Sequence, residues 1–221
     1  MGKLMKHRMV RQRYSRKPIA AAAAVAGVLT ALAAAPASAS AVPISATGAT
    51  TLTLGGQAYN KLQTVTCGTL VVTSSDNVTV TPTAKGVKFI VPITGLEVQP
   101  DSGAIRLDHA GSVTLENNCY SITLGTFRIT DFGQSDMSTS FDLSAVTKSA
   151  DDSGRQVIGT LDLSTAQVTI TGTKVRVAQM GLLTSDEGAE ELNELAVGDP
   201  SGPFAGGMKI GSAKTRVVLH F

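Results

Sequence analysis

Tryptophan is missing from this sequence of 221 residues, and other aromatic residues are few, with three tyrosines and six phenylalanines. Carbohydrate-binding sheets present exposed aromatic platforms, and outer-membrane barrels carry aromatic girdles around an outward apolar band. So small an aromatic supply fits neither class. The composition instead favours a domain whose core is built from aliphatic side chains.

The sequence also lacks the short motifs of common catalytic chemistry. It contains no GxSxG nucleophile elbow, no HExxH zinc pair, no phosphate-binding loop and no dinucleotide-binding glycine pattern. Beyond the N-terminal segment His109 and His220 are the only histidines, so a serine triad is difficult to assemble. We expect no catalytic residues and no metal site, although scattered carboxylates could still meet as a glycosidase pair.

The N-terminus has the three parts of an export signal. Residues 1–17 hold seven basic side chains and no acidic one, and an alanine-rich apolar run follows over Ile19–Ala35. A proline then ends any helix, and the small residues after it suit signal-peptidase cleavage behind Ala39 or Ala41. An uncleaved membrane anchor is the alternative, but the apolar run is short for a full span. We predict a signal peptide over residues 1–39 and a mature protein without a membrane span, which is secreted and extracellular or associated with the cell wall.

Removal of the signal peptide reverses the net charge. The full sequence has 19 basic and 17 acidic side chains, but without the seven basic ones of residues 1–17 it has 12 against 17, a net charge of −5. A nucleic-acid partner is therefore not expected. The remaining residues, roughly 180, suffice for one domain. We predict a short linker over residues 40–49 and a single β-rich domain over residues 50–221.

Cysteine usage agrees with export. Cys67 and Cys119 are the only cysteines, and an oxidising compartment favours a disulfide between them. A metal site or a catalytic thiol is the alternative, but two thiols so far apart in sequence make a poor metal motif. We therefore predict a structural disulfide that closes a loop of 53 residues, counting both ends.

The rest of the chain has the pattern of an all-β protein. Short runs rich in Val, Ile, Thr and Leu, such as Val87–Ile93 and Lys214–Phe221, alternate with Gly, Asn, Asp and Ser. Glycine followed by threonine, as at Gly125 and Gly159, predicts a turn before a strand. Many short strands without intervening helices predict an antiparallel β-sandwich, immunoglobulin-like or partly barrel-like.

One helix is predicted in the C-terminal half, from Ser185 to about Val197. Thr184 and Glu187 have the spacing of a capping box, with Thr184 as the N-cap. The helix carries several acidic residues and no basic one, which indicates a solvated face whose first acids favour the N-terminal dipole. A cation or a basic partner is the functional alternative for this acidic stretch.

The two histidines differ in their expected surroundings. Strand alternation places His220 beside Arg216 on the outer face of the last strand, where it is a surface residue. In the run Ala104–His109 the same alternation places His109 on the apolar face, with Ile105 and Leu107. His109 is therefore the candidate ligand-binding residue, and a hydrogen-bonded structural histidine is the alternative.

Several short segments follow one another in a distinctive order, and they are Phe89–Gly95, Gly103–Arg106, His109–Leu115, Ile122–Leu124, Phe127–Ile129 and Val197–Gly202. This order resembles that of the Htaa-type domains of secreted and cell-surface actinobacterial proteins. The resemblance spans about residue 50 to the C-terminus. It implies a β-rich extracellular module, with haem as the ligand of the best-known members. The aromatic segment that holds the ligand tyrosine of those members has no counterpart here, so only His109 falls in a matching stretch.

The sequence thus indicates a secreted, non-catalytic β-sandwich module that binds a small molecule or a component of the cell envelope. A haem-binding protein of Htaa type that uses His109 is one alternative. A secreted hydrolase that relies on paired carboxylates is another.

The disulfide leads to a test on the exported protein. We expect no free thiol in the unreduced protein, and two after reduction. Reduction should lower the free energy of unfolding by up to about 4 kcal/mol, because the cross-link restricts the unfolded chain. A Cys67→Ser, Cys119→Ser variant should match the reduced protein in stability. Two free thiols in the freshly exported protein would contradict the pairing.

Overall fold

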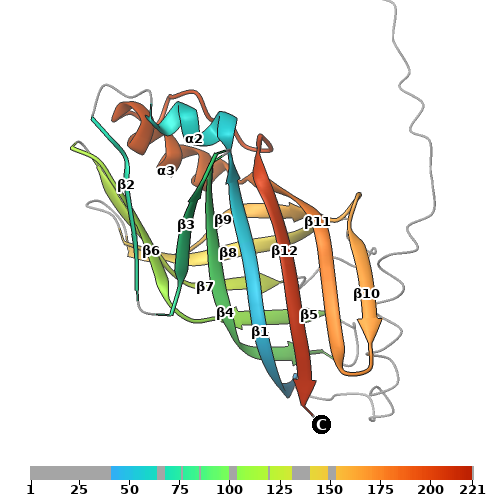
Figure 1. The fold of residues 1–221 in the computed structure, drawn as a ribbon. Coiled ribbons are helices and arrows are strands. Elements are labelled where there is room, and N and C mark those ends of the chain that lie inside the picture. The colour runs from blue at the N-terminus through green and yellow to red at the C-terminus, as the bar shows by residue number, and fades with distance from the viewer. Residues whose placement is uncertain are drawn as a thin grey trace, which may run out of the picture.

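The computed structural model describes residues 41–63, 68–75, 77–84, 86–99, 104–118, 120–130, 140–148 and 153–220. Within these ranges the chain forms twelve strands and two helices (Figure 1). The strands are β1 (Val42–Gly55), β2 (Val71–Ser74), β3 (Thr79–Thr83), β4 (Gly86–Val98), β5 (Ile105–His109), β6 (Ser112–Glu116), β7 (Ser121–Thr130), β8 (Ser140–Lys148), β9 (Ser153–Asp162), β10 (Gln167–Thr171), β11 (Lys174–Thr184) and β12 (Lys209–His220). The helices are α2 (Gly56–Gln63) and α3 (Asp186–Val197). Neither described helix is long and apolar enough to span a bilayer.

Eight of the strands close into a barrel. Their order is β7-β5-β4-β1-β12-β11-β9-β8, and β8 pairs with β7 to complete the ring. Every one of these pairings is antiparallel. The sheet continues outside the ring, where β6 and β2 extend from β7, β3 pairs with β4, and β10 pairs with β11. The predicted all-β antiparallel fold is confirmed, and its strand pairing is that of a closed barrel.

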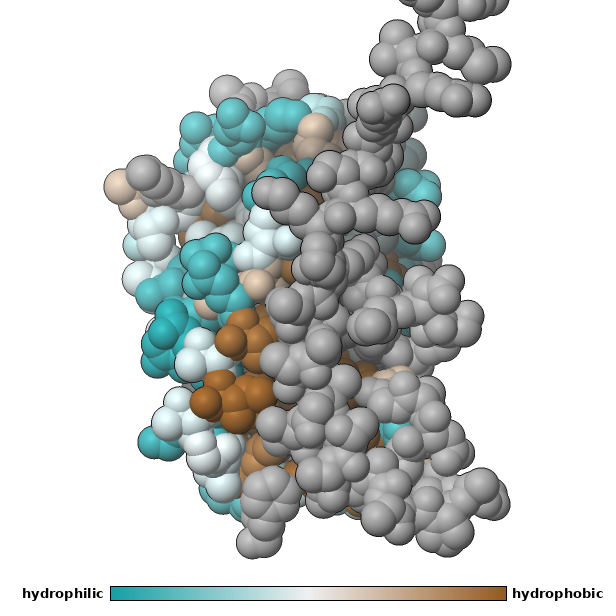
Figure 2. Space-filling model, turned by 90° about the vertical axis from the view of Figure 1, so that its right-hand side faces the viewer, coloured by the Kyte–Doolittle hydropathy of each residue, from teal (hydrophilic) through white to brown (hydrophobic). Residues whose placement is uncertain are grey.

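Strand alternation directs aliphatic side chains into one shared interior. In the second half of β1 the buried residues are Thr50, Leu52 and Leu54, and the residues between them are only half-buried. β5 shows the same pattern, with His109 buried beside the aliphatic residues and the charged residues between them half-buried. Because alternate residues of a strand point to opposite faces, each strand contributes one side to a common core. Seen from the side of β10 (Figure 2), some hydrophobic residues remain exposed among hydrophilic ones.

Residues 42–49 form the first half of β1, although the sequence placed them in a linker. The glycines at 125 and 159 also differ from the prediction. Both lie inside continuous strands, Gly125 in β7 and Gly159 in β9, and neither starts a turn. Next to each of them the register of β8 shifts, so each glycine accompanies a β-bulge.

α3 confirms the predicted helix, but its N-cap lies one residue later than predicted. The N-cap is Ser185, whose hydroxyl oxygen accepts a hydrogen bond from the amide of Gly188 at 2.9 Å. Thr184 does not cap the helix, because its hydroxyl donates to the carbonyl of Ala205. Gly198 ends the helix in the left-handed conformation that glycine adopts without strain, with φ +71°.

α2 was not predicted from the sequence. It has eight residues, and only Ala58 and Leu62 among them are buried. Two buried residues are too few for a helical periodicity to stand out. α2 packs beside α3, and the two helices lie over one end of the barrel (Figure 1).

A close approach to β9 fixes α3 over the barrel. A Cβ atom on Gly188 would lie 2.0 Å from the carbonyl oxygen of Ile158, so only glycine fits at this contact. Hydrogen bonds secure the other side of the helix. The Asn117 side chain donates to the carbonyl of Leu195 at 2.6 Å, and Asn193 bonds both the amide and the carbonyl of Phe204.

We expect Gly188→Ala to lower the free energy of unfolding by about 1–3 kcal/mol, because the methyl group must displace α3 from β9. Gly154→Ala is the matched control, since a Cβ atom on Gly154 meets nothing within 4 Å. Urea unfolding of both variants measures the difference. Equal stability of the two variants would show that α3 does not need this close approach.

Candidate functional site

An apolar cavity of about 90 Å³ lies inside the barrel, under α3. Its walls come from eight strands of the sheet and one side of the helix. The lining residues are Leu52, Leu54, Phe89, Val113, Leu115, Ile122, Leu124, Phe127, Leu143, Ile158, Leu182, Gly188, Glu191, Leu192, Leu195 and Ile210. Glu191 is the only charged residue among them, and neither His109 nor His220 belongs to the lining.

The periodicities of strand and helix explain how this lining forms. On β1 the lining residues Leu52 and Leu54 are two positions apart, as inward residues of a strand must be. On α3 the lining residues follow one another at intervals of three, one and three, which places Gly188, Glu191 and Leu195 on one side of the helix. The side chain of Glu191 accepts a hydrogen bond from the Tyr120 hydroxyl at 2.9 Å.

A layer of three polar side chains crosses the interior beside the cavity. His109 Nε2 lies 2.7 Å from the Thr50 hydroxyl, which lies 3.0 Å from the hydroxyl of Thr215. All three residues are buried, with exposed fractions of 4%, 2% and 3%. On β1, Thr50 is the inward residue that precedes Leu52, so the layer borders the apolar lining directly.

The partners of the imidazole determine where its proton lies. Nδ1 of His109 lies 3.2 Å from the carbonyl oxygen of Phe127, which can only accept, so Nδ1 carries the hydrogen. In the neutral ring Nε2 then has a free lone pair and accepts from the Thr50 hydroxyl. The oxygen of Thr50 in turn accepts from Thr215. The three side chains thus form one directed chain of hydrogen bonds that ends at a backbone carbonyl.

Burial keeps this histidine neutral. Desolvation lowers the pKa of His109 to about 4, and it outweighs the carbonyls of Phe127 and Leu107 and the charge of Asp108, which act in the opposite direction. A neutral ring matches the hydrogen-bond pattern, because a protonated ring would have no lone pair to accept from Thr50.

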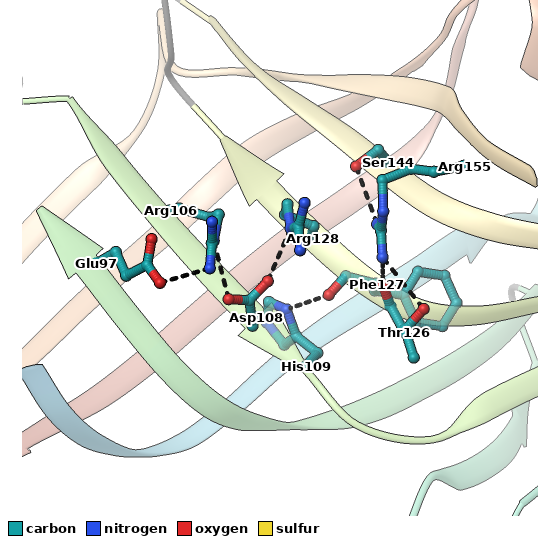
Figure 3. A network of polar contacts seen from close by, with 9 residues as sticks. All are labelled: Glu97, Arg106, Asp108, His109, Thr126, Phe127, Arg128, Ser144 and Arg155. Carbon is teal, nitrogen blue, oxygen red and sulfur yellow. Dashed lines mark hydrogen bonds and ion pairs between the residues drawn. The ribbon is translucent and has the colours of Figure 1, made fainter. Parts of the chain in front are cut away.

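A bulge in β7 places the Phe127 carbonyl against His109 (Figure 3). Next to it, Thr126 has a positive φ of 43°, which is rare for a β-branched residue. Arg155 stabilises this turn of the backbone by donating to the Thr126 carbonyl at 3.0 Å and to its hydroxyl at 3.2 Å. The guanidinium also donates to the Ser144 hydroxyl on β8.

An ion-pair network occupies the opposite face of β5. Asp108 accepts from Nε of Arg106 at 2.9 Å and from Nε of Arg128 at 2.8 Å, and Arg106 also pairs with Glu97. Partial burial raises the pKa of the Asp108 carboxyl, but the two arginines together hold it below its usual value. Both carboxylates are therefore paired with cations, and neither faces the other across a cleft.

The structure describes only some of the predicted site residues. His109 lies on the apolar face, as predicted, and His220 is exposed, with Nε2 2.9 Å from the Thr47 hydroxyl. Cys67, Cys119 and the cleavage site at Ala39 lie outside the described residues.

The sequence neighbours of the two cysteines do lie against each other. A Cβ atom built on Gly68 would be 2.7 Å from Nδ2 of Asn118. The disulfide remains a proposal, and this proximity supports it.

Sequence reasoning missed the partners of His109 and most of the cavity. Thr50 and Thr215 are 59 and 106 positions from His109, and no local motif connects them. The alternation of Thr50 with Leu52 and Leu54 was a usable signal, because it places a hydroxyl in an otherwise aliphatic row. Phe127 lay in a segment that matches the Htaa-type domains, but its role as the carbonyl partner depends on the bulge.

Comparison with known proteins shows the class of fold. No protein-family model matches the sequence, and no curated protein matches it. The C-terminal domain of HtaA from Corynebacterium glutamicum is similar in structure, with 15% identity and a TM-score of 0.58 over 82% of this chain and 100% of that domain. The heme binding protein HtaB from the same organism covers 82% of this chain and 96% of its own, with 13% identity and a TM-score of 0.49.

The barrel, with its helices over one end, is therefore an HtaA-type fold, and the resemblance seen in the sequence is confirmed at the level of fold. At 15% identity the likeness concerns the path of the backbone.

We expect the protein to lose stability as the pH falls from about 6.5 to about 4, the ordinary and the lowered pKa of His109. In this window the unfolded chain binds a proton at His109 and the folded chain does not, so protonation favours unfolding. The full loss from this residue is about 3 kcal/mol. Urea unfolding across the window measures it.

His109→Gln should remove this part of the pH dependence, whatever its effect on stability at neutral pH. His220→Gln is the control, and it should retain the dependence because His220 is exposed. An unchanged pH profile in His109→Gln would contradict the neutral, buried imidazole.

Proposed function

We propose that this protein is a non-catalytic module that holds the apolar part of a small molecule inside its barrel. The observation that carries the proposal is the cavity under α3, whose lining has one charged residue among sixteen. Apolar cavities of this kind stay dry and bind small hydrophobic molecules. An apolar lining with one charged group fits a binding site in which burial of the ligand's apolar surface supplies the affinity.

The same lining supports a role other than catalysis. Hydrolysis by paired carboxylates needs two acidic groups on either side of the substrate, and this cavity has Glu191 alone. Glu97 and Asp108, which share Arg106 as a partner, are on the outside of the sheet and paired with arginines. No histidine lines the cavity, and its one carboxylate, that of Glu191, accepts a hydrogen bond from the Tyr120 hydroxyl.

Haem, which the family resemblance implies, does not fit the residues around His109 as they are arranged. Both ring nitrogens of His109 have hydrogen-bond partners, and the side chain is 4% exposed. Iron could reach Nε2 only by displacing the Thr50 hydroxyl. A cavity of about 90 Å³ is also small beside cofactor sites, which typically measure about 300–1,000 Å³. We therefore assign the cavity to a smaller ligand, or to one end of a longer one.

The proposed place of action is outside the cytoplasm. The basic segment, the apolar run and the small residues before Ala41 support export. In that setting the mature module would take up an apolar ligand, or the apolar end of a larger molecule, from the cell envelope.

The proposal is tested with benzene and with butanol, hexanol and octanol as probes, followed by methyl resonances in NMR. We expect saturable shifts at cavity methyl groups, and affinity that rises about fourfold with each methylene group until the cavity is full. Ile158→Phe should abolish the shifts, because it fills the cavity. Val157→Phe is the matched control, since Val157 is the exposed neighbour on the same strand.

Binding that is equal in Ile158→Phe and Val157→Phe would place the ligand elsewhere, and an absence of saturable shifts would contradict the proposal. Titration with haemin is the parallel arm. We expect no Soret shift that depends on His109. A sharp Soret band that is lost in His109→Ala but kept in Ile158→Phe would favour haem binding.

A further inference from the structure

The outer faces of neighbouring strands carry basic side chains and no acidic ones. β1, β12, β11 and β10 lie side by side (Figure 1), and none of the four contains an aspartate or a glutamate. Their outward positions, with the adjoining first half of β4, include five cations that lie near one another. These are Lys88, Lys174, Arg176, Lys214 and Arg216, which we call the cationic face.

The strand register shows that these residues share one side of the sheet. Arg176 is directly opposite Arg216, which is opposite Ala49 on β1. Lys174 and Lys214 are each two positions from one of these arginines, so alternation places them on the same side. The residues between them in both strands are buried or half-buried and point inward. Lys88 points outward because the next residue, Phe89, lines the cavity.

This arrangement has a cost that folding alone does not explain. Like charges directly opposite each other on an antiparallel pair are destabilising, and Arg176 faces Arg216 in this way. Among the described residues the three ion pairs all lie around Asp108 and Arg106, so none of them neutralises the cationic face. The chain without its signal peptide has a net charge of −5, so the positive charge is concentrated locally.

The cationic face is also smooth. Its cations are separated by small side chains, among them Ala49, Thr51, Thr53, Thr169 and Ser212. On the left of Figure 2, hydrophilic and nearly neutral residues lie beside a group of hydrophobic ones. The cations are spread over β4, β12 and β11 and do not follow a single line. A broad field of charge matches a flat anionic surface better than it matches one polymer strand.

We propose that the cationic face docks this protein on an anionic phospholipid surface through the lipid phosphate groups. The charge complementarity and the two-dimensional spread of the five cations carry this inference. The apolar residues on the same side, Ile90 and Val218, are half-buried, so the attraction is electrostatic and peripheral. The docking would leave the cavity under α3 free, and it does not depend on what the cavity binds.

The test is flotation of the mature protein with vesicles of phosphatidylcholine alone, and with vesicles of phosphatidylcholine and phosphatidylglycerol in equal parts. We expect binding to the anionic vesicles only. Binding should weaken with added salt and disappear near 1 M, where the screening length falls to about 3 Å.

Arg176→Gln with Arg216→Gln is the decisive variant. It should lower the affinity for anionic vesicles about 30-fold, which is about fivefold for each charge removed. Lys61→Gln with Arg128→Gln removes the same charge away from the cationic face, and it should bind like the wild type. Loss of the opposed like charges should leave the Arg176, Arg216 variant at least as stable as the wild type, so weaker binding is not a sign of misfolding.

Three results would overturn the proposal. They are an absence of binding to anionic vesicles, equal binding by the two double variants, and binding to soluble dextran sulfate without binding to vesicles. The last result would assign the cationic face to a soluble polyanion. Because vesicle flotation does not involve the cavity, failure here leaves the ligand proposal intact, and failure of the ligand proposal leaves docking intact.

Discussion

Closure of eight strands into a ring is the constraint on which the other features depend. Once β7 and β8 pair, the inward residue of every strand enters the same interior, and the backbone groups of the ring find partners within it. The ring leaves an end to be covered, and α3 covers it through the close contact at Gly188. The cavity is the space that aliphatic side chains leave beneath that helix, and the outward residues remain free to carry charge.

Within this mostly aliphatic interior, Thr50, His109 and Thr215 are polar exceptions. Each of the three side chains has a hydrogen-bond partner. A buried imidazole without partners would be costly, but here each ring nitrogen has one, and the proton is assigned by the Phe127 carbonyl. The strained backbone at Thr126 is explained by the same contact, because the bulge orients that carbonyl. A histidine that binds a ligand needs a ring nitrogen without another partner, and both ring nitrogens of His109 have partners in this arrangement. The polar layer therefore acts as structure, and the apolar space beside it is the better candidate for binding.

The sequence was most informative where the argument used local periodicity. Alternation placed His109 inside and His220 outside, and the acidic segment near residue 190 was correctly predicted as a helix. Prediction from the sequence failed where one residue type suits more than one local structure. Glycine fits a turn or a bulge, so the turn predicted at Gly125 was wrong. Thr184 and Ser185 can both cap a helix, so the N-cap was placed one residue too early. α2 was too short to show a period. The cavity and the partners of His109 could not be predicted, because they arise from strands that are far apart in sequence and adjacent only in the closed ring.

The pairing of β1 with β12 has a consequence for how the protein reaches its native state. Ser45 is opposite His220, so the first and last strands of the described chain are neighbours over ten residue pairs. A contact of such large sequence separation forms late, because the loop-closure entropy of the intervening chain must be overcome first. A chain exported from its N-terminus would therefore have β1 waiting beside an open edge until its final strand emerged. Delayed closure would keep the polypeptide open during translocation and would leave the edge of β1 that later meets β12 exposed to chaperones or to aggregation in the interval.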